Sequence, residues 1–189
     1  MLKSRLQELF ETKIRDEVKK ERGYENPMQV PNLVKITLNV GVGEGKDNPK
    51  VLESALKTLA TVTGQKPIIQ RSKKSISNFK LRAGQPVGAS VTLRSHLMWH
   101  FYDKLVSVVL PRIRDFQGIS VRNLDGRGNL NIGLKDQLVF PEIVFDEVEH
   151  LKGMSITIVT SAKDDLEGGF LLSKLGMPFR DFKVAEEIA

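Results

Sequence analysis

The sequence predicts an α+β fold in which helices cover one face of a mostly antiparallel sheet and leave the other face open and polar. Segments with helix and strand periodicity follow the order helix, strand, helix, strand, strand, helix, loop, strand, helix, which resembles a split β-α-β arrangement. The two clearest strands carry polar residues opposite their apolar ones, so one side must face water or a polar partner. A long basic loop joins two of the strands.

The chain begins with an amphipathic helix over residues 2–22. Apolar residues recur in it at spacings of three and four among many charges, and Gly23 follows where a helix would end. After the break at Asn26 and Pro27, apolar and polar residues alternate from 34 to 40, which predicts a strand with one face in the core. The polar side chains of this strand are Lys35, Thr37 and Asn39.

A second helix begins at Asn48, a residue type that caps helices, and Pro49, which suits the first helical position. Its apolar pattern continues to Gly64. A short strand is predicted over residues 67–71 and a longer one over residues 87–94. The polar side chains of the longer strand are Ser90, Thr92 and Arg94.

A third helix starts after Ser95, which can cap it, and ends at Pro111. Next comes a polar region punctuated by glycines, residues 121–133, which indicates a hairpin or a mobile loop. The β-rich segment from 154 to 161 predicts the last strand.

The last helix is predicted from Asp164 to Gly176. Gly168 and Gly169 lie inside it, and two interior glycines cost about 2 kcal/mol relative to alanine. We therefore expect this helix to be broken or short.

Length and composition favour one soluble domain. With 189 residues, 40% of them hydrophobic, the chain can bury one sizeable core. We expect a single domain over residues 1–180 and an acidic tail of unassigned role at 181–189. There is no cysteine, no apolar run typical of a signal peptide and none long enough to span a membrane, which predicts a cytoplasmic protein without a membrane partner.

The positive charge of the chain is concentrated in one block. The net charge is +6, yet the segment from Ser54 to Tyr102 contains eight lysines and arginines and no acid, two charges more than the total. The rest of the chain therefore has a net charge of −2. A basic balance favours an anionic partner, either nucleic acid or an acidic membrane surface, without choosing between them.

The densest part of this block is the predicted loop at residues 72–85. Such a charge run is often only a solvated surface, but here no acid pairs with it, hydroxyl and amide side chains are interleaved, and Phe79 is embedded. Cations, hydroxyls and an aromatic ring suit phosphate, ribose and base contacts, so we favour RNA binding, with RNA only modestly preferred over DNA. The candidate residues are Arg71, Lys73, Lys74, Ser75, Ser77, Asn78, Phe79, Lys80 and Arg82.

Two other motifs weakly suggest enzymes or metal sites. The glycine-rich segment from Gly41 to Asp47 has neither the spacing of a Walker loop nor that of a dinucleotide-binding turn, so a flexible turn is the better interpretation. His96 and His100 are spaced as metal ligands on a helix, but no third ligand is close in the sequence. We expect no catalytic residue, no metal and no cofactor.

Several sequence blocks in one order closely resemble the bacterial large ribosomal subunit protein five family, which binds 5S rRNA. The resemblance spans about residues 1–180. The blocks are residues 36–43 (ITLNVGVG), 63–67 (TGQKP), 73–82 (KKSISNFKLR), 91–94 (VTLR), 110–116 (LPRIRDF) and 176–180 (GMPFR).

This resemblance implies a non-catalytic constituent of the large subunit that attaches 5S rRNA in the central protuberance. By position, Asn39, Gln65 and Thr92 would be polar contacts to 5S rRNA, and we add the neighbouring strand residues. The full predicted 5S rRNA site is Lys35, Thr37, Asn39, Gln65, Ser90, Thr92 and Arg94. Expected further partners are large-subunit rRNA and other central-protuberance proteins.

Two more partners are implied by the resemblance. The basic loop would approach the peptidyl-site tRNA, and the 122–133 region would reach a small-subunit head protein to form an inter-subunit bridge. The predicted bridge residues are Arg112, Arg114, Arg122, Asp125 and Arg127.

Two alternatives remain open at the level of the sequence. The same fold could serve a free-standing RNA chaperone or regulatory RNA-binding protein, and binding to the large subunit distinguishes the two. A nucleotide-dependent enzyme built on Gly41 to Lys46 is the other alternative, and stabilisation by a nucleotide would be its signature.

Overall fold

The computed structural model describes residues 3–43, 48–144 and 151–180. The chain forms two compact units. Of the described residues, the first unit contains 3–36, 94–132 and 157–180, and the second contains 37–43, 48–93, 133–144 and 151–156. The single domain expected over residues 1–180 stays a prediction. The acidic tail and part of the Gly41–Asp47 turn lie outside the described residues.

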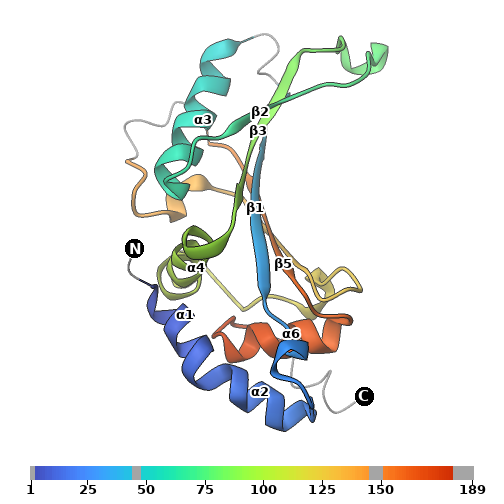
Figure 1. The fold of residues 1–189 in the computed structure, drawn as a ribbon. Coiled ribbons are helices and arrows are strands. Elements are labelled where there is room, and N and C mark those ends of the chain that lie inside the picture. The colour runs from blue at the N-terminus through green and yellow to red at the C-terminus, as the bar shows by residue number, and fades with distance from the viewer. Residues whose placement is uncertain (1–2, 44–47, 145–150, 181–189) are drawn as a thin grey trace. The chain divides into compact units, whose positions relative to one another are not determined.

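Five strands form an antiparallel sheet in the order β2-β3-β1-β5-β4 (Figure 1). They are β1 (Leu33–Gly41), β2 (Ile68–Arg71), β3 (Pro86–Leu93), β4 (Leu130–Leu134) and β5 (Met154–Thr160). The predicted α+β class is confirmed. Strand β4 was missed, because its asparagine and glycine are typical of loops, although its apolar residues alternate and are buried.

In the first unit, two long helical runs pack together. The first run is α1 (Arg5–Leu9), a π-helical turn (Phe10–Ile14) and α2 (Arg15–Arg22), and Gly23 ends it at φ 68°. The second is α4 (Ser95–Lys104), a π-helical turn (Leu105–Val109) and α5 (Leu110–Arg112). The rings of Phe10 and Trp99 lie 5.4 Å apart between their centroids. Both predicted helices are confirmed.

The predicted cap of the second run is wrong. Arg94 occupies the N-cap position of α4, which begins at Ser95, and no side chain caps the helix. Pro111 lies inside α5, because a proline early in a helical turn needs no backbone donor.

The last helix of the first unit, α6 (Asp165–Lys174), is not broken. It continues through Gly168 and Gly169, both buried, so of the two expected alternatives, a broken or a short helix, the break does not occur. Gly176 follows its end at φ 87°. The reason for a glycine inside the helix is a contact with the loop before β4, described below.

In the second unit, α3 (Pro49–Thr63) packs against β3. Asn48 caps it as predicted, since its side chain accepts a hydrogen bond from the Lys50 N–H, and Gly64 ends it at φ 67°. Residues such as Leu59, Val91 and Leu93 are almost completely buried. Because α3 covers one face of these strands, the opposite face stays open.

Candidate nucleic-acid interface

The open face of the second unit carries the strand residues that the sequence predicted. On β1, Leu38 and Val40 are buried, whereas Thr37 is half-buried and Asn39 is exposed. On β3, the neighbouring strand, Ser90 is half-buried and Thr92 is exposed between buried residues. Successive side chains of a strand point to opposite faces, so these four polar side chains share the open face.

Strand β2 extends this face, which the sequence did not reveal. Ile68 pairs with Ser90 and Gln70 pairs with Gly88, so Ile68 and Gln70 lie on the same side as Ser90. The Gln70 Nε2 donates a hydrogen bond to Ser90 Oγ at 2.6 Å, which confirms that they share a face. Both residues fell outside the predicted site because the alternation on β2 is too short to assign faces.

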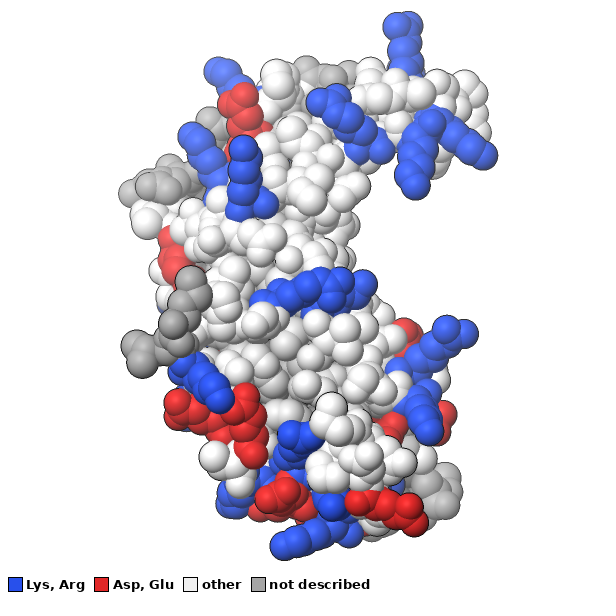
Figure 2. All heavy atoms as spheres, in the orientation of Figure 1, with Lys and Arg blue, Asp and Glu red and all other residues white. Residues whose placement is uncertain are grey.

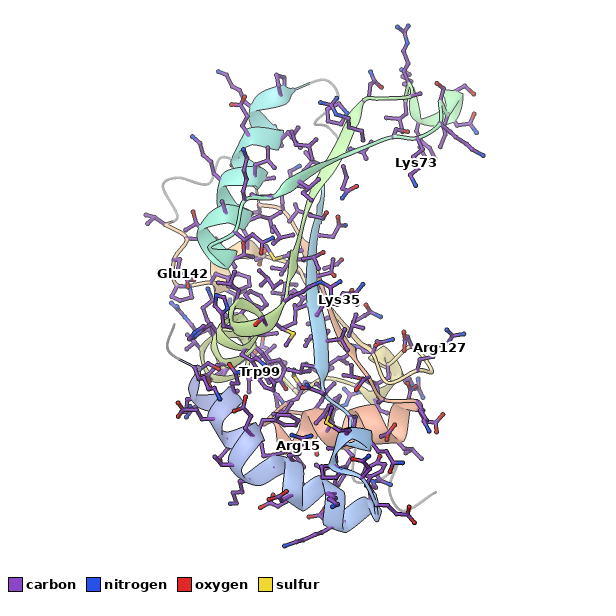
Figure 3. All side chains as sticks on the ribbon, in the orientation of Figure 1. Arg15, Lys35, Lys73, Trp99, Arg127 and Glu142 are labelled. Carbon is purple, nitrogen blue, oxygen red and sulfur yellow. The ribbon has the colours of Figure 1, made fainter. Side chains whose placement is uncertain are left out.

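Three other predicted 5S rRNA residues lie at different places. Gln65 is on the connection between Gly64 and β2. The Thr63 hydroxyl donates a hydrogen bond to the Gln65 carbonyl and accepts one from the Gln65 N–H. Lys35 (Figure 3) and Arg94 belong to the first unit, each two residues along the chain from Thr37 or Thr92. Of the seven predicted residues, Thr37, Asn39, Ser90 and Thr92 therefore lie together on the open face of the second unit.

The connection from Ser72 to Gln85, which we call the basic arm, is an ordered extension of the β2–β3 hairpin. Backbone hydrogen bonds join Ser72 to Gln85 and, in both directions, Ile76 to Leu81. A 3₁₀ turn at Ser77–Phe79 forms the tip (Figure 1). The predicted long loop is thus a two-stranded arm.

Side chains hold the arm in shape. The Ser75 hydroxyl accepts a hydrogen bond from the Ala83 N–H at 3.0 Å, and Gln85 Oε1 accepts one from the Arg82 N–H at 2.8 Å. Arg71 donates to the carbonyl of Gly84 at 3.0 Å. Ser75 and Arg71, predicted as RNA contacts, therefore also have a structural role.

The cations of the arm point into solvent. Lys73, Lys74, Lys80 and Arg82 are exposed, and none of them forms an ion pair within the part of the chain that the structure describes. Figure 2 shows lysine and arginine atoms along the arm and no acidic ones on the visible side, and Lys73 projects from it in Figure 3. At the tip, the Phe79 side chain is 69% exposed. The arm therefore presents charge and an aromatic ring together.

The predicted bridge region forms a tight loop in the first unit. An isolated antiparallel bridge pairs Leu124 with Leu130, and the Asp125 carboxylate accepts hydrogen bonds from the Arg127 N–H and from the backbone and side chain of Asn129. The bond from the Asn129 side chain holds the pKa of the Asp125 carboxyl below its usual value. Asp125 thus shapes the loop from within.

Helix α6 anchors this loop. Asp165 accepts hydrogen bonds from Gly126 N–H at 3.0 Å and Gly128 N–H at 2.8 Å, and the Thr160 hydroxyl donates to the Gly128 carbonyl at 2.8 Å. The sequence analysis did not assign Asp165 a role in this loop. An acidic residue in the first turn of a helix is already explained by its favourable interaction with the helix dipole, so the sequence gives no sign of a second role.

The arginines of the predicted bridge site are all exposed on the first unit. Arg122 and Arg127 lie on or beside the loop, and Arg127 projects away from it (Figure 3). Arg112 ends α5, and Arg114 lies 4.0 Å from the carboxylate of its neighbour Asp115. All of these side chains belong to the first unit.

Enzyme-like features are weak in the described residues. Residues 44–47 of the glycine-rich turn are outside them, and no group of three acidic, histidine or cysteine side chains within the described ranges could hold a metal ion. Among the described helices, none has the length and apolarity of a membrane span.

Comparison with known proteins identifies the family. Residues 26–82 match the family described as "Ribosomal protein L5", and residues 86–179 match the model for the C-terminus of the same ribosomal family. A protein of Anaeromyxobacter sp. (strain Fw109-5) called "Large ribosomal subunit protein uL5" is 52% identical over 94% of this chain and 98% of its own length. The protein of the same name in Geobacter sulfurreducens is 52% identical over 94% of this chain and 99% of its own. The one in Natranaerobius thermophilus is 51% identical over 93% of this chain and 98% of its own, and the chain therefore belongs to the ribosomal protein L5 family.

Proposed function

We propose that this protein is a non-catalytic, cytoplasmic constituent of the large ribosomal subunit that binds 5S rRNA through the open strand face of its second unit. The observation that carries the proposal is the array of solvent-facing Thr37, Asn39, Ser90 and Thr92 beside buried apolar neighbours. These side chains offer hydrogen-bond donors and acceptors without aromatic rings. They suit ribose and base edges of a folded RNA better than stacking on single-stranded bases.

The basic arm would contact a different RNA, the peptidyl-site tRNA. Its internal hydrogen bonds support this role, because an arm held in shape loses little conformational entropy when it binds. Its exposed cations provide affinity for phosphate through counterion release.

The loop around Asp125 and the exposed arginines Arg122 and Arg127 would form the contact with a small-subunit head protein. The anchoring by Asp165 supports this proposal, since a rigid loop presents its arginines at little entropic cost. Arg112 and Arg114 would add to it. Large-subunit rRNA and other central-protuberance proteins are the further proposed partners.

The proposed function is tested by measuring the affinity of the whole protein for 5S rRNA over a series of salt concentrations. We expect the affinity for 5S rRNA to exceed that for an unrelated RNA of equal length by at least about a hundredfold. Nearly equal affinity for the two RNAs would contradict 5S rRNA recognition, and failure to cosediment with large subunits at high salt would contradict the ribosomal role.

A further inference from the structure

Within the second unit, the positions of β1, β2 and β3 that alternation and pairing assign to the open face carry no charged side chain, and the next position along this side of β1 is Lys35. On β1 the face presents Thr37, Asn39 and Gly41, and the remaining positions on β2 and β3 are equally neutral. These remaining positions are Ile68, Gln70, Gly88, Ser90 and Thr92. Exposed cations of this unit lie elsewhere, for example on the arm, on α3 and on the connection after α3, so these strand positions themselves cannot gain affinity by neutralising phosphates.

An apolar side chain lies within this polar face. Ile68 is 66% exposed, although it is directly opposite Ser90 and on the same side as Gln70. The Gln70 amide beside it is fixed by its 2.6 Å hydrogen bond to Ser90. The result is an isoleucine next to hydroxyl and amide groups, an arrangement that matches a ligand surface of mixed polarity.

The minor groove of double-helical RNA has this mixed surface. It is wide and shallow, and it exposes 2′-hydroxyls and base edges between the carbon-bound hydrogens of the riboses, while the phosphates lie at its rims. Hydroxyl and amide side chains can bind the 2′-hydroxyls, and an aliphatic side chain can pack on the sugars. An uncharged face fits the floor of this groove better than it fits the phosphate backbone.

We propose that Ile68 and Gln70 extend the RNA-binding face onto β2, and that this face lies in a minor groove of 5S rRNA with Ile68 packed against ribose. The inference rests on the proposed function, since it takes 5S rRNA as the ligand. It adds a contact whose free energy comes from apolar burial, so its contribution does not depend on salt.

A pair of substitutions of equal shape tests the contact. Ile68→Val and Ile68→Thr both keep a β-branched side chain suited to a strand. Valine and threonine have nearly the same shape, but threonine has a hydroxyl group where valine has a methyl group. We expect Ile68→Val to bind 5S rRNA within about twofold of the wild type and Ile68→Thr to bind about fivefold more weakly. The slope of log affinity against log salt should be the same for all three proteins. Ile76→Ser on the arm, where the isoleucine is 43% exposed, serves as the positional control and should not weaken 5S rRNA binding.

A second measurement does not depend on the stability of the threonine variant. The chain contains no cysteine, so Ile68→Cys offers a single thiol for an iron chelate that generates hydroxyl radicals. In the complex with 5S rRNA it should cleave both strands across one minor groove. The same chelate on Thr61→Cys, an exposed position of α3, should not cleave there.

The outcomes separate the two proposals. If wild-type protein does not prefer 5S rRNA, the proposed function fails and the inference falls with it. If the wild type prefers 5S rRNA but Ile68→Thr binds like Ile68→Val, or the tethered iron leaves the minor groove uncut, only the inference is overturned. A shallower salt slope for Ile68→Thr would also overturn it, because it would indicate a phosphate contact.

Discussion

A Cβ atom built on Gly168 would lie 2.5 Å from the Cα atom of Gly128, a distance that side chains do not tolerate. The loop before β4 therefore packs its backbone directly onto helix α6 at these two glycines. Gly128 also has φ 72°, a left-handed conformation that glycine adopts without strain. The glycine inside the helix is explained by this contact, which outweighs its unfavourable helix propensity.

Gly168→Ala should destabilise the protein, although alanine normally stabilises a helix by about 1 kcal/mol relative to glycine. The added methyl group meets backbone atoms, which cannot move aside, so we expect a net loss of about 2 kcal/mol and a lower melting temperature. Gly133→Ala is the control, since a Cβ at Gly133 meets nothing within 4 Å. A Gly168→Ala variant as stable as the wild type would show that the loop does not pack on the helix.

Asp165→Asn should loosen the loop that contains Gly126 and Gly128. The carboxylate accepts two backbone N–H bonds, and an asparagine amide would turn one acceptor into a donor, for a loss of about 1–2 kcal/mol. Hydrogen exchange of the Gly126 and Gly128 amides should accelerate. Asp164→Asn is the matched control, because the Asp164 side chain makes no capping bond. Unchanged exchange in Asp165→Asn would refute the anchoring role.

The sequence predicts the four main helices and four of the five strands, because these depend on periodicity and end signals within one segment. Strand β4 was missed because Asn131 and Gly133 outweighed the alternation of its apolar residues, and the break in α6 was expected because propensity is a local property. What Gly168 touches is determined by a residue 40 positions earlier. No pattern within the helix contains that information.

The candidate site was predictable to a similar extent. The polar faces of β1 and β3 follow from alternation within each strand, but the placement of Ile68 and Gln70 depends on the register between β2 and β3. The order within the arm depends on side chains such as Ser75 and Gln85 bonding to backbone across the hairpin. These relationships between strands are visible only in three dimensions.

Both tyrosines should ionise late in the folded protein. Burial, together with the hydrogen bond to the Glu167 carboxylate, raises the pKa of Tyr24 from 10.0 to about 12, and burial raises the pKa of the Tyr102 phenol as well. The pKa of each tyrosine is higher in the folded protein than in the unfolded chain. The contribution of the two tyrosines to the free energy of unfolding is therefore fully present below pH 10, and it is lost as the pH rises through the pKa values of the folded state.

Ultraviolet absorbance measures this ionisation directly, since the chain has only two tyrosines. We expect little tyrosinate signal from the folded protein at pH 11, whereas in denaturant both tyrosines should be half ionised near pH 10. Tyr24→Phe should remove the step near pH 12 and leave that of Tyr102. A folded protein whose two tyrosines both titrate near pH 10 would contradict the burial of these phenols.

The open face and the basic arm should contribute to different activities. Asn39→Ala combined with Thr92→Ala removes polar groups of the face, so we expect about tenfold weaker 5S rRNA binding with an unchanged salt slope. Replacing the four arm cations Lys73, Lys74, Lys80 and Arg82 with alanine should leave 5S rRNA binding within about twofold and weaken binding of tRNA to the peptidyl site of reconstituted ribosomes.

Thermal melting followed by circular dichroism checks that both variants fold. The melting temperature should change little, because the replaced side chains are exposed. The salt series distinguishes the two kinds of contact, because only the loss of cations that touch phosphate makes the dependence on salt shallower. If the arm variant and the face variant lose 5S rRNA affinity equally, the arm binds 5S rRNA itself. The assignment of the arm to a second RNA would then be wrong.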